Sequence, residues 1–110
     1  MKKLEAFIQA FMLDDVKQAL SEIGFKTMTT SDVLSHGGPE GQKGIYRGQE
    51  YKVDLLPKIQ IEVVVEDRLS DQVVEAIIQA ARTGEIGDGR VFVLPVTRGY
   101  RIRTGELDAS

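Results

Sequence analysis

Residues 58–66, with the sequence KIQIEVVVE, form the clearest strand pattern in the chain. Their apolar side chains recur at every second position, which places them on one face of an extended strand. Further along, apolar residues recur at helical spacing over residues 70–81, with Ser70 as a candidate N-cap. Residues 90–96 then predict another strand. This half of the chain is therefore predicted to form a strand–helix–strand unit.

The N-terminal half has the same order of predicted elements. Residues 3–11 alternate partly between apolar and polar side chains and predict a strand, although phenylalanines make its second side apolar too. A helix is predicted from residue 13 or 14 to Gly24, and residues 25–34 predict a second strand. Two such units in tandem indicate an α+β fold, the ferredoxin-like βαββαβ sandwich, with the helices on one face of an antiparallel sheet. The other face would need cover, which an oligomer interface could supply.

Composition excludes several classes of protein. The 110 residues match one globular domain, 42% of them hydrophobic and 28% charged. The net charge of −3 argues against general nucleic-acid binding, which needs a basic surface. Without cysteine there is no disulfide frame, no thiol nucleophile and no Cys-ligated zinc. The sequence shows no signal-peptide pattern and no apolar run near the ~20 residues of a membrane span, so we expect a cytoplasmic protein that does not insert into membranes.

A glycine-rich stretch, residues 83–93 with the sequence TGEIGDGRVFV, lies between the second predicted helix and the last predicted strand. Glycine permits positive φ and leaves room for a ligand, and successive N–H groups in such a turn can converge on an anion. Arg90 adds a planar group suited to phosphate. Arg101 and Arg103 follow at strand spacing, and we expect them on one face. The combination predicts a polyphosphate site, such as a nucleotide site.

Each of these features also has a simpler interpretation. Residues 87–90, Gly-Asp-Gly-Arg, could form a plain turn, and the two later arginines could lie on a solvated surface. His36, alone in a glycine-rich segment, is interpreted as a surface residue. Asp67, Asp71 and Asp88 are interpreted as capping or turn residues. The sequence shows no nucleophile–base pair and no acidic metal cluster. This argues against a small nucleotide hydrolase, the alternative from a different class.

Residues 35–56 fit no element of this pattern. A loop near 20 residues in a compact domain is usually functional or disordered. Its expected tip, YRGQEY at residues 46–51, carries two aromatic side chains and two charges. This segment, residues 83–93 and RIRTGE at residues 101–106 together resemble signature sequences of the PII family of signal-transduction proteins. The resemblance covers nearly the whole chain with almost no shift in spacing.

The resemblance implies a single PII-like domain over residues 1–110 and a homotrimer, with adenine nucleotide in the clefts between neighbouring subunits. It implies a T-loop at about 37–55 that binds a target protein, such as a membrane transporter or a metabolic enzyme. It also implies a B-loop at about 82–90 and, from the adjacent subunit, a C-loop at about 101–106. The nucleotide-binding residues that it implies are Thr29, Gly37, Glu62, Val64, Gly87, Asp88, Gly89, Arg90, Arg101 and Arg103.

The effector site departs from the family's pattern. Many PII proteins carry Gly-Arg-Gln-Lys-Gly at the base of the T-loop, where the Gln coordinates magnesium beside ATP and the metal chelates 2-oxoglutarate. An ungapped alignment places Pro39 at this Gln, and only a shifted alignment lets Gln42 replace it. Lys58 matches the family's lysine that contacts 2-oxoglutarate. Tyr51 matches a tyrosine that is uridylylated in some relatives and unmodified in many.

The resemblance implies a non-enzymatic regulator that binds ATP or ADP/AMP, with magnesium possible, and controls its target through the T-loop. The substitution at Pro39 leaves a same-family alternative open: a PII-like regulator of a bicarbonate or metal transporter that senses ADP or AMP rather than 2-oxoglutarate. A metal-tolerance trimer of similar fold without nucleotide is a further alternative. The Gly-Asp-Gly-Arg turn argues against it.

Overall fold

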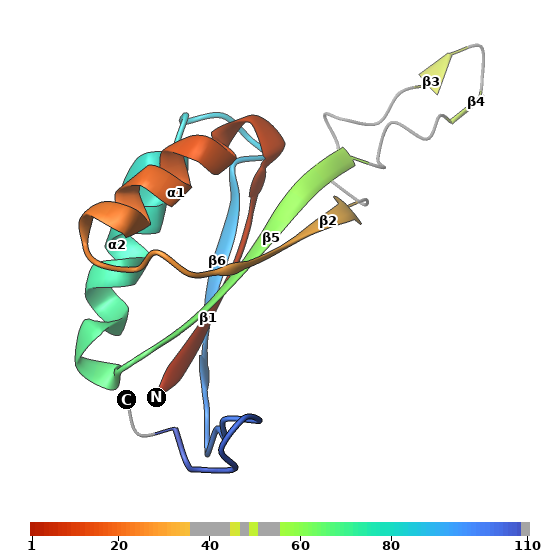
Figure 1. Ribbon diagram of the computed structural model, residues 1–110. Helices are drawn as coiled ribbons and strands as arrows, with labels where there is room; N and C mark the ends of the chain where they lie inside the picture. The colour runs from red at the N-terminus through yellow and green to blue at the C-terminus, as the bar shows by residue number, and fades with distance from the viewer. Residues whose placement is uncertain (36–44, 47–48, 51–55, 109–110) are drawn as a thin grey trace.

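The computed structural model describes residues 1–35, 45–46, 49–50 and 56–108. Short helices η1 (Ala10–Met12) and η4 (Asp67–Leu69) precede the two α-helices, and a small hairpin joins β3 (Ile45–Tyr46) to β4 (Gln49–Glu50). The main elements follow the predicted order βαββαβ (Figure 1): β1 (Lys2–Gln9), α1 (Leu13–Glu22), β2 (Thr29–Ser35), β5 (Leu56–Val65), α2 (Ser70–Ala81) and β6 (Gly89–Pro95).

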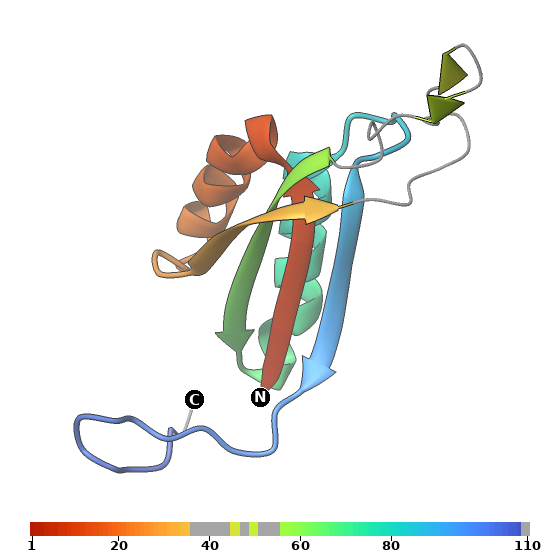
Figure 2. The same ribbon diagram turned by 90° about the vertical axis from the view of Figure 1, so that its right-hand side faces the viewer.

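The main strands form a four-stranded sheet in the order β2-β5-β1-β6, and each neighbouring pair is antiparallel. Both α-helices cover the same face of this sheet (Figures 1 and 2). The predicted α+β architecture is therefore confirmed, and the strand order is consistent with the ferredoxin-like sandwich. We call the face of the sheet away from the helices the open face.

Alternation along the central strands decides which side chains enter the core. Every second residue of β1 and β5 points toward the helices, as the apolar pattern predicted, and the helices contribute residues at helical spacing. Between the sheet and the helices the buried apolar side chains form one cluster. Its members are Leu4, Ala6, Ile8, Val16, Leu20, Ile59, Ile61, Val63, Val65, Val73, Ile77 and Ala81.

Gly24 ends α1 as predicted, through a Schellman motif. It has φ +101°, its N–H donates to the Ser21 carbonyl at 3.0 Å, and the Phe25 N–H donates to the Leu20 carbonyl at 2.8 Å. Because Phe25 serves this helix end and packs against the core, the chain becomes a strand only at Thr29. The prediction that β2 starts at residue 25 is therefore wrong by four residues.

Three other predicted details are corrected by the structure. The first strand ends at Gln9 instead of Phe11, because the chain turns into η1 at Ala10. Ser70 is not the N-cap of α2: Leu69 has that position. The Ser70 hydroxyl is buried inside the first turn and donates to the Asp67 carbonyl at 3.0 Å. The segment predicted as loop from residue 35 to 56 contains the β3–β4 hairpin.

The open face of the sheet carries both charged and apolar side chains. Phe7 of β1 and Phe92 of β6 make an edge-to-face contact, with ring centroids 6.1 Å apart. Val64 and Leu94, at alternate positions in their strands, are also exposed in the single chain. This face is therefore partly apolar, and none of the helices in the described part of the chain packs against it.

Neither α1 nor α2, the α-helices among the described residues, has the length and the apolar character that crossing a membrane requires.

Candidate functional site

The glycine-rich stretch forms the turn between α2 and β6, and three of its glycines have backbone angles that favour glycine. Gly84, Gly87 and Gly89 have φ of +91°, +103° and +112°. Side chains at such angles are strained. The backbone angles therefore give a physical reason for this glycine pattern, from which the sequence predicted a phosphate-binding turn. We call residues 83–89 the glycine turn.

The Asp88 carboxylate organises the glycine turn from inside. Its Oδ2 accepts hydrogen bonds from the backbone N–H groups of Thr83 at 2.8 Å and Gly84 at 2.9 Å, and its Oδ1 accepts one from the Thr83 hydroxyl at 2.5 Å. These bonds lower the pKa of Asp88 to about 2, and the bond from the Thr83 hydroxyl has the largest effect. The Asp88 side chain is thus ionised at neutral pH and bound to the turn itself. This is the turn and capping role that the simpler interpretation gave to aspartates.

Two side chains of the sheet hold the glycine turn from the outside. Gln9 Nε2 donates to Asp88 Oδ1 at 3.1 Å, and Lys58 Nζ donates to the Gly87 carbonyl at 2.5 Å. Gln9 and Lys58 lie directly opposite each other in the β1–β5 pair. The sequence gave no signal for Gln9, because it lies 79 positions from Asp88 and only the sheet brings the two together.

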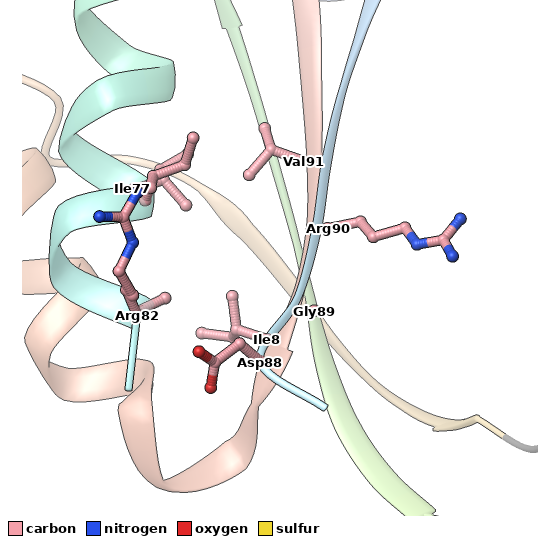
Figure 3. Close-up of a pocket in the computed structure, with 9 residues that line it drawn as sticks. Ile8, Ile77, Arg82, Asp88, Gly89, Arg90 and Val91 are labelled. Carbon is pink, nitrogen blue, oxygen red and sulfur yellow. The ribbon is translucent and has the colours of Figure 1, made fainter. Parts of the chain in front are cut away.

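A pocket of about 240 Å³ lies beside the glycine turn on the helix side, between α2 and β6. Figure 3 shows Ile77 and Arg82 on one side of it and Val91 on the other, while the Arg90 side chain points away. Most of its lining is aliphatic, which suits an apolar group better than phosphate. The Arg90 side chain therefore lies on the open face. Arg82, which lines the pocket, was not among the residues predicted from the sequence.

Three predicted nucleotide-binding residues lie together on the open face. Thr29 is opposite Glu62 in the β2–β5 pair, and Val64 follows two residues later in β5. The Glu62 carboxylate lies 3.5 Å from Lys3 Nζ. The pKa of Lys3 is raised, first by its hydrogen bond to Glu5 and then by the attraction of Glu62. Arg90, on β6, lies two strands from Glu62 and Val64, which is about 10 Å across the sheet. It lies three strands from Thr29.

The segment 96–108, which contains Arg101 and Arg103, follows the C-terminal end of β6, the end opposite the glycine turn (Figure 2). The two arginines are part of a loop closed by the Tyr100–Leu107 bridge and by a hydrogen bond from the Gly105 N–H to the Arg101 carbonyl at 2.7 Å. The expectation of strand spacing is therefore wrong, because the chain turns between the two arginines. The Arg101 guanidinium lies 3.5 Å from an Asp108 carboxylate oxygen. Within one chain, these arginines are separated from Gly87, Gly89 and Arg90.

Most of the predicted T-loop lies outside the described residues, and so do four of the predicted site residues, Gly37, Pro39, Gln42 and Tyr51. The structure therefore brings together Gly87, Gly89 and Lys58 at one end of the sheet, and Thr29, Glu62 and Val64 on its open face.

The comparison with known proteins agrees with this fold and these motifs. The family model of the nitrogen regulatory protein P-II matches residues 1–106. The chain is 56% identical over 106 residues to the nitrogen regulatory protein P-II of Haemophilus influenzae, covering 96% of this chain and 95% of that protein. It is 55% identical to that of Azospirillum brasilense over the same length, with the same coverage. It is 52% identical over 108 residues to the nitrogen regulatory protein P-II 1 of Escherichia coli, covering 98% and 96%. The resemblance found in three sequence segments is thereby confirmed, and the chain belongs to the nitrogen regulatory protein P-II family.

Proposed function

We propose that this member of a regulatory family acts as a homotrimer that binds adenine nucleotide between subunits and controls a target protein through residues 37–55. The observation that carries the proposal is the division of the arginines. Arg90 follows the glycine turn directly, while Arg101 and Arg103 come after the other end of β6. A phosphate group held by all three needs two chains.

The glycine turn supplies the first half of this site. Its positive-φ glycines leave the backbone free of side chains, and the Asp88 carboxylate is already bound to Thr83, Gly84 and Gln9. The adjacent Arg90 side chain adds a permanent positive charge on the open face. A preorganised turn with a neighbouring guanidinium is suited to binding a polyphosphate.

A second copy of the chain supplies the other half. A contact between the glycine turn of one subunit and the loop at residues 101–106 of the next is heterologous, and such contacts form closed rings when the rotation closes. A ring of three copies, each packing its open face toward the others, would cover Phe7, Phe92, Val64 and Leu94. This supports the trimer, because a short chain gains stability when an exposed apolar face is buried.

Adenine nucleotide is the ligand that the open face fits best. Thr29, Glu62 and Val64 provide a hydroxyl, a carboxylate and an apolar contact at one position of the sheet. These three residues would bind the base and ribose of a nucleotide. Its phosphates would lie between Arg101 and Arg103 of the same chain and the neighbour's glycine turn. Different nucleotides would then favour different arrangements of residues 37–55, to the extent that their phosphate contacts differ.

The regulatory role is preferred over nucleotide hydrolysis. The relatives that match over nearly the whole chain are named as regulatory proteins. Within the glycine turn, the Asp88 carboxylate has a low pKa and accepts hydrogen bonds from Thr83, Gly84 and Gln9, so it is a poor general base.

Two measurements test the proposal. Sedimentation equilibrium should give the mass of three chains at micromolar concentration, and a stable monomer would contradict the trimer. Calorimetry should give one site per chain for ATP, ADP or AMP. A purified trimer that binds none of the three would contradict the nucleotide site while leaving the oligomer intact.

A further inference from the structure

We infer that Gln9 is a positioning residue for the proposed nucleotide site: it anchors the glycine turn to β1 through the Asp88 carboxylate. The inference rests on the proposed nucleotide binding. Gln9 itself is not assigned to contact the ligand. Its role is to fix the position of the turn whose backbone receives the phosphates.

Asp88 accepts two kinds of hydrogen bond, those from within the turn and the one from Gln9, and only the second connects the turn to the sheet. The bonds from Thr83 and Gly84 join residues within five positions of Asp88, and they would hold the turn together wherever it lay. The bond from Gln9 is different, because it joins the same carboxylate to a strand 79 positions away. Gln9 therefore determines where the turn sits relative to the sheet.

Lys58 provides the second anchor and gives the arrangement its precision. Lys58 donates to the Gly87 carbonyl, and its cross-strand neighbour Gln9 donates to the Asp88 carboxylate. Because the Gly87–Asp88 peptide is planar, fixing its carbonyl on one side and the Asp88 side chain on the other also fixes the direction of its N–H. An N–H group held in place before the ligand arrives binds an anion with less loss of entropy.

The anchor from Gln9 is strong for a neutral side chain. Its acceptor is an ionised carboxylate, and hydrogen bonds to ionised groups are shorter and stronger than those between neutral groups. Both Gln9 and Asp88 are half-buried, so water competes less for the bond than at an exposed site. Removing the Gln9 donor leaves the turn internally bonded but free to move away from β1.

The test compares variants of the full-length protein by their affinity for ATP and for adenosine. Gln9→Leu removes the donor, and Gln9→Lys retains one that can reach the same carboxylate. Gln79→Leu is the matched control, because Gln79 Nε2 donates to Glu75 at the same 3.1 Å on the exposed surface of α2. We expect Gln9→Leu to weaken ATP binding about tenfold and to leave adenosine binding unchanged. Gln9→Lys should restore the ATP affinity, and Gln79→Leu should match the parent.

Amide hydrogen exchange in the nucleotide-free protein tests the anchor independently. Gln9→Leu should speed exchange at Gly89 and Arg90, the first residues of β6, which pair with β1 beside the turn, and leave β5 unchanged. If Gln9→Leu fails to fold, Gln9→Glu takes its place, because it keeps the size of the side chain and sets two carboxylates against each other.

The outcomes are distinct. Parent-like ATP affinity and parent-like exchange in Gln9→Leu would overturn the inference and leave the proposed function standing. A parent protein that binds no nucleotide would overturn the proposed function. It would also overturn the part of the inference that links Gln9 to phosphate binding. Accelerated exchange in Gln9→Leu would then still establish Gln9 as the anchor of the turn.

Discussion

Gly89 passes so close to Phe7 that a Cβ atom at position 89 would lie 1.7 Å from the Phe7 carbonyl oxygen. The clash is with backbone, and the φ of Gly89 is +112°, so neither a rotamer change nor a small shift of a side chain relieves it. This contact fixes the start of β6 against the end of β1. It therefore places the glycine turn next to Gln9.

Replacing Gly89 by alanine should destabilise the protein strongly. Backbone strain and overpacking each cost about 1–3 kcal/mol, so we expect Gly89→Ala to lower the free energy of unfolding by about 3 kcal/mol. Urea unfolding measures this. Gly24→Ala is the matched control, because Gly24 has a similar φ of +101° but nothing within 4 Å of its Cβ position. It should cost about 1 kcal/mol. Equal costs for the two variants would contradict the close approach to Phe7.

The low pKa of Asp88 predicts how stability depends on pH in the acid range. The folded-state pKa is about 2, below the ordinary value of 3.8, so the ionised carboxylate stabilises the fold fully above the ordinary value. This contribution declines as pH falls from 3.8 toward 2 and is absent below both. Asp88→Asn should therefore be less stable than the parent at neutral pH, and the difference should shrink as the pH falls toward 2 and be lost below it. Thermal unfolding across this range tests the expectation, and an NMR titration that places the Asp88 midpoint near 3.8 would contradict it.

Loss of one arginine from the loop after β6 should weaken nucleotide binding without affecting the fold. A charge-assisted contact to phosphate contributes roughly 1.5–3 kcal/mol, so Arg103→Ala should raise the Kd for ATP about ten- to a hundredfold. Arg68→Ala is the control, because Arg68 is exposed and its guanidinium pairs only locally with Glu66 at 3.1 Å. An unchanged Kd in Arg103→Ala would remove this residue from the site.

The effector 2-oxoglutarate should bind weakly or not at all, even with MgATP present. Magnesium requires near-octahedral oxygen coordination, and the Pro39 side chain has no oxygen. Lys58 alone offers one ion pair, and its ammonium already donates to the Gly87 carbonyl. Titration of 2-oxoglutarate against the MgATP-loaded protein tests this. Micromolar affinity that Gln42→Ala abolishes would show that Gln42 takes the place of the missing ligand, and micromolar affinity in both proteins would contradict this description of the site.

The fold was predictable to the level of element order because its signals are local and strong. Period-two alternation over residues 58–66 and helical spacing over residues 70–81 match β5 and α2 closely. The errors fall where a tertiary contact competes with a local preference. Phe25 has strand propensity but completes the end of α1, and Ser70 is a good capping residue but is buried inside the first turn of α2.

The candidate site was predictable in its residue types but not in its construction. The positive-φ requirement explains the glycines from Gly84 to Gly89, and it can be inferred from the local sequence. The separation of Arg103 from Arg90 cannot be inferred locally, because it depends on the length and direction of β6 and on the turn closed by Gly105. Spacing alone had placed the two arginines of this loop on one strand face.

By itself, the sequence determined the α+β architecture, the apolar face of each strand and the glycines of the turn, since these follow from side-chain periodicity and backbone sterics over a few residues. Only the tertiary structure decided that Gln9 and Lys58 anchor the turn and that Arg90 faces away from Arg82. Such contacts depend on strand register. The pairing of Gln9 with Lys58, and the close approach of Gly89 to Phe7, arise because the buried alternate residues of β1 fix its register against β5 and β6.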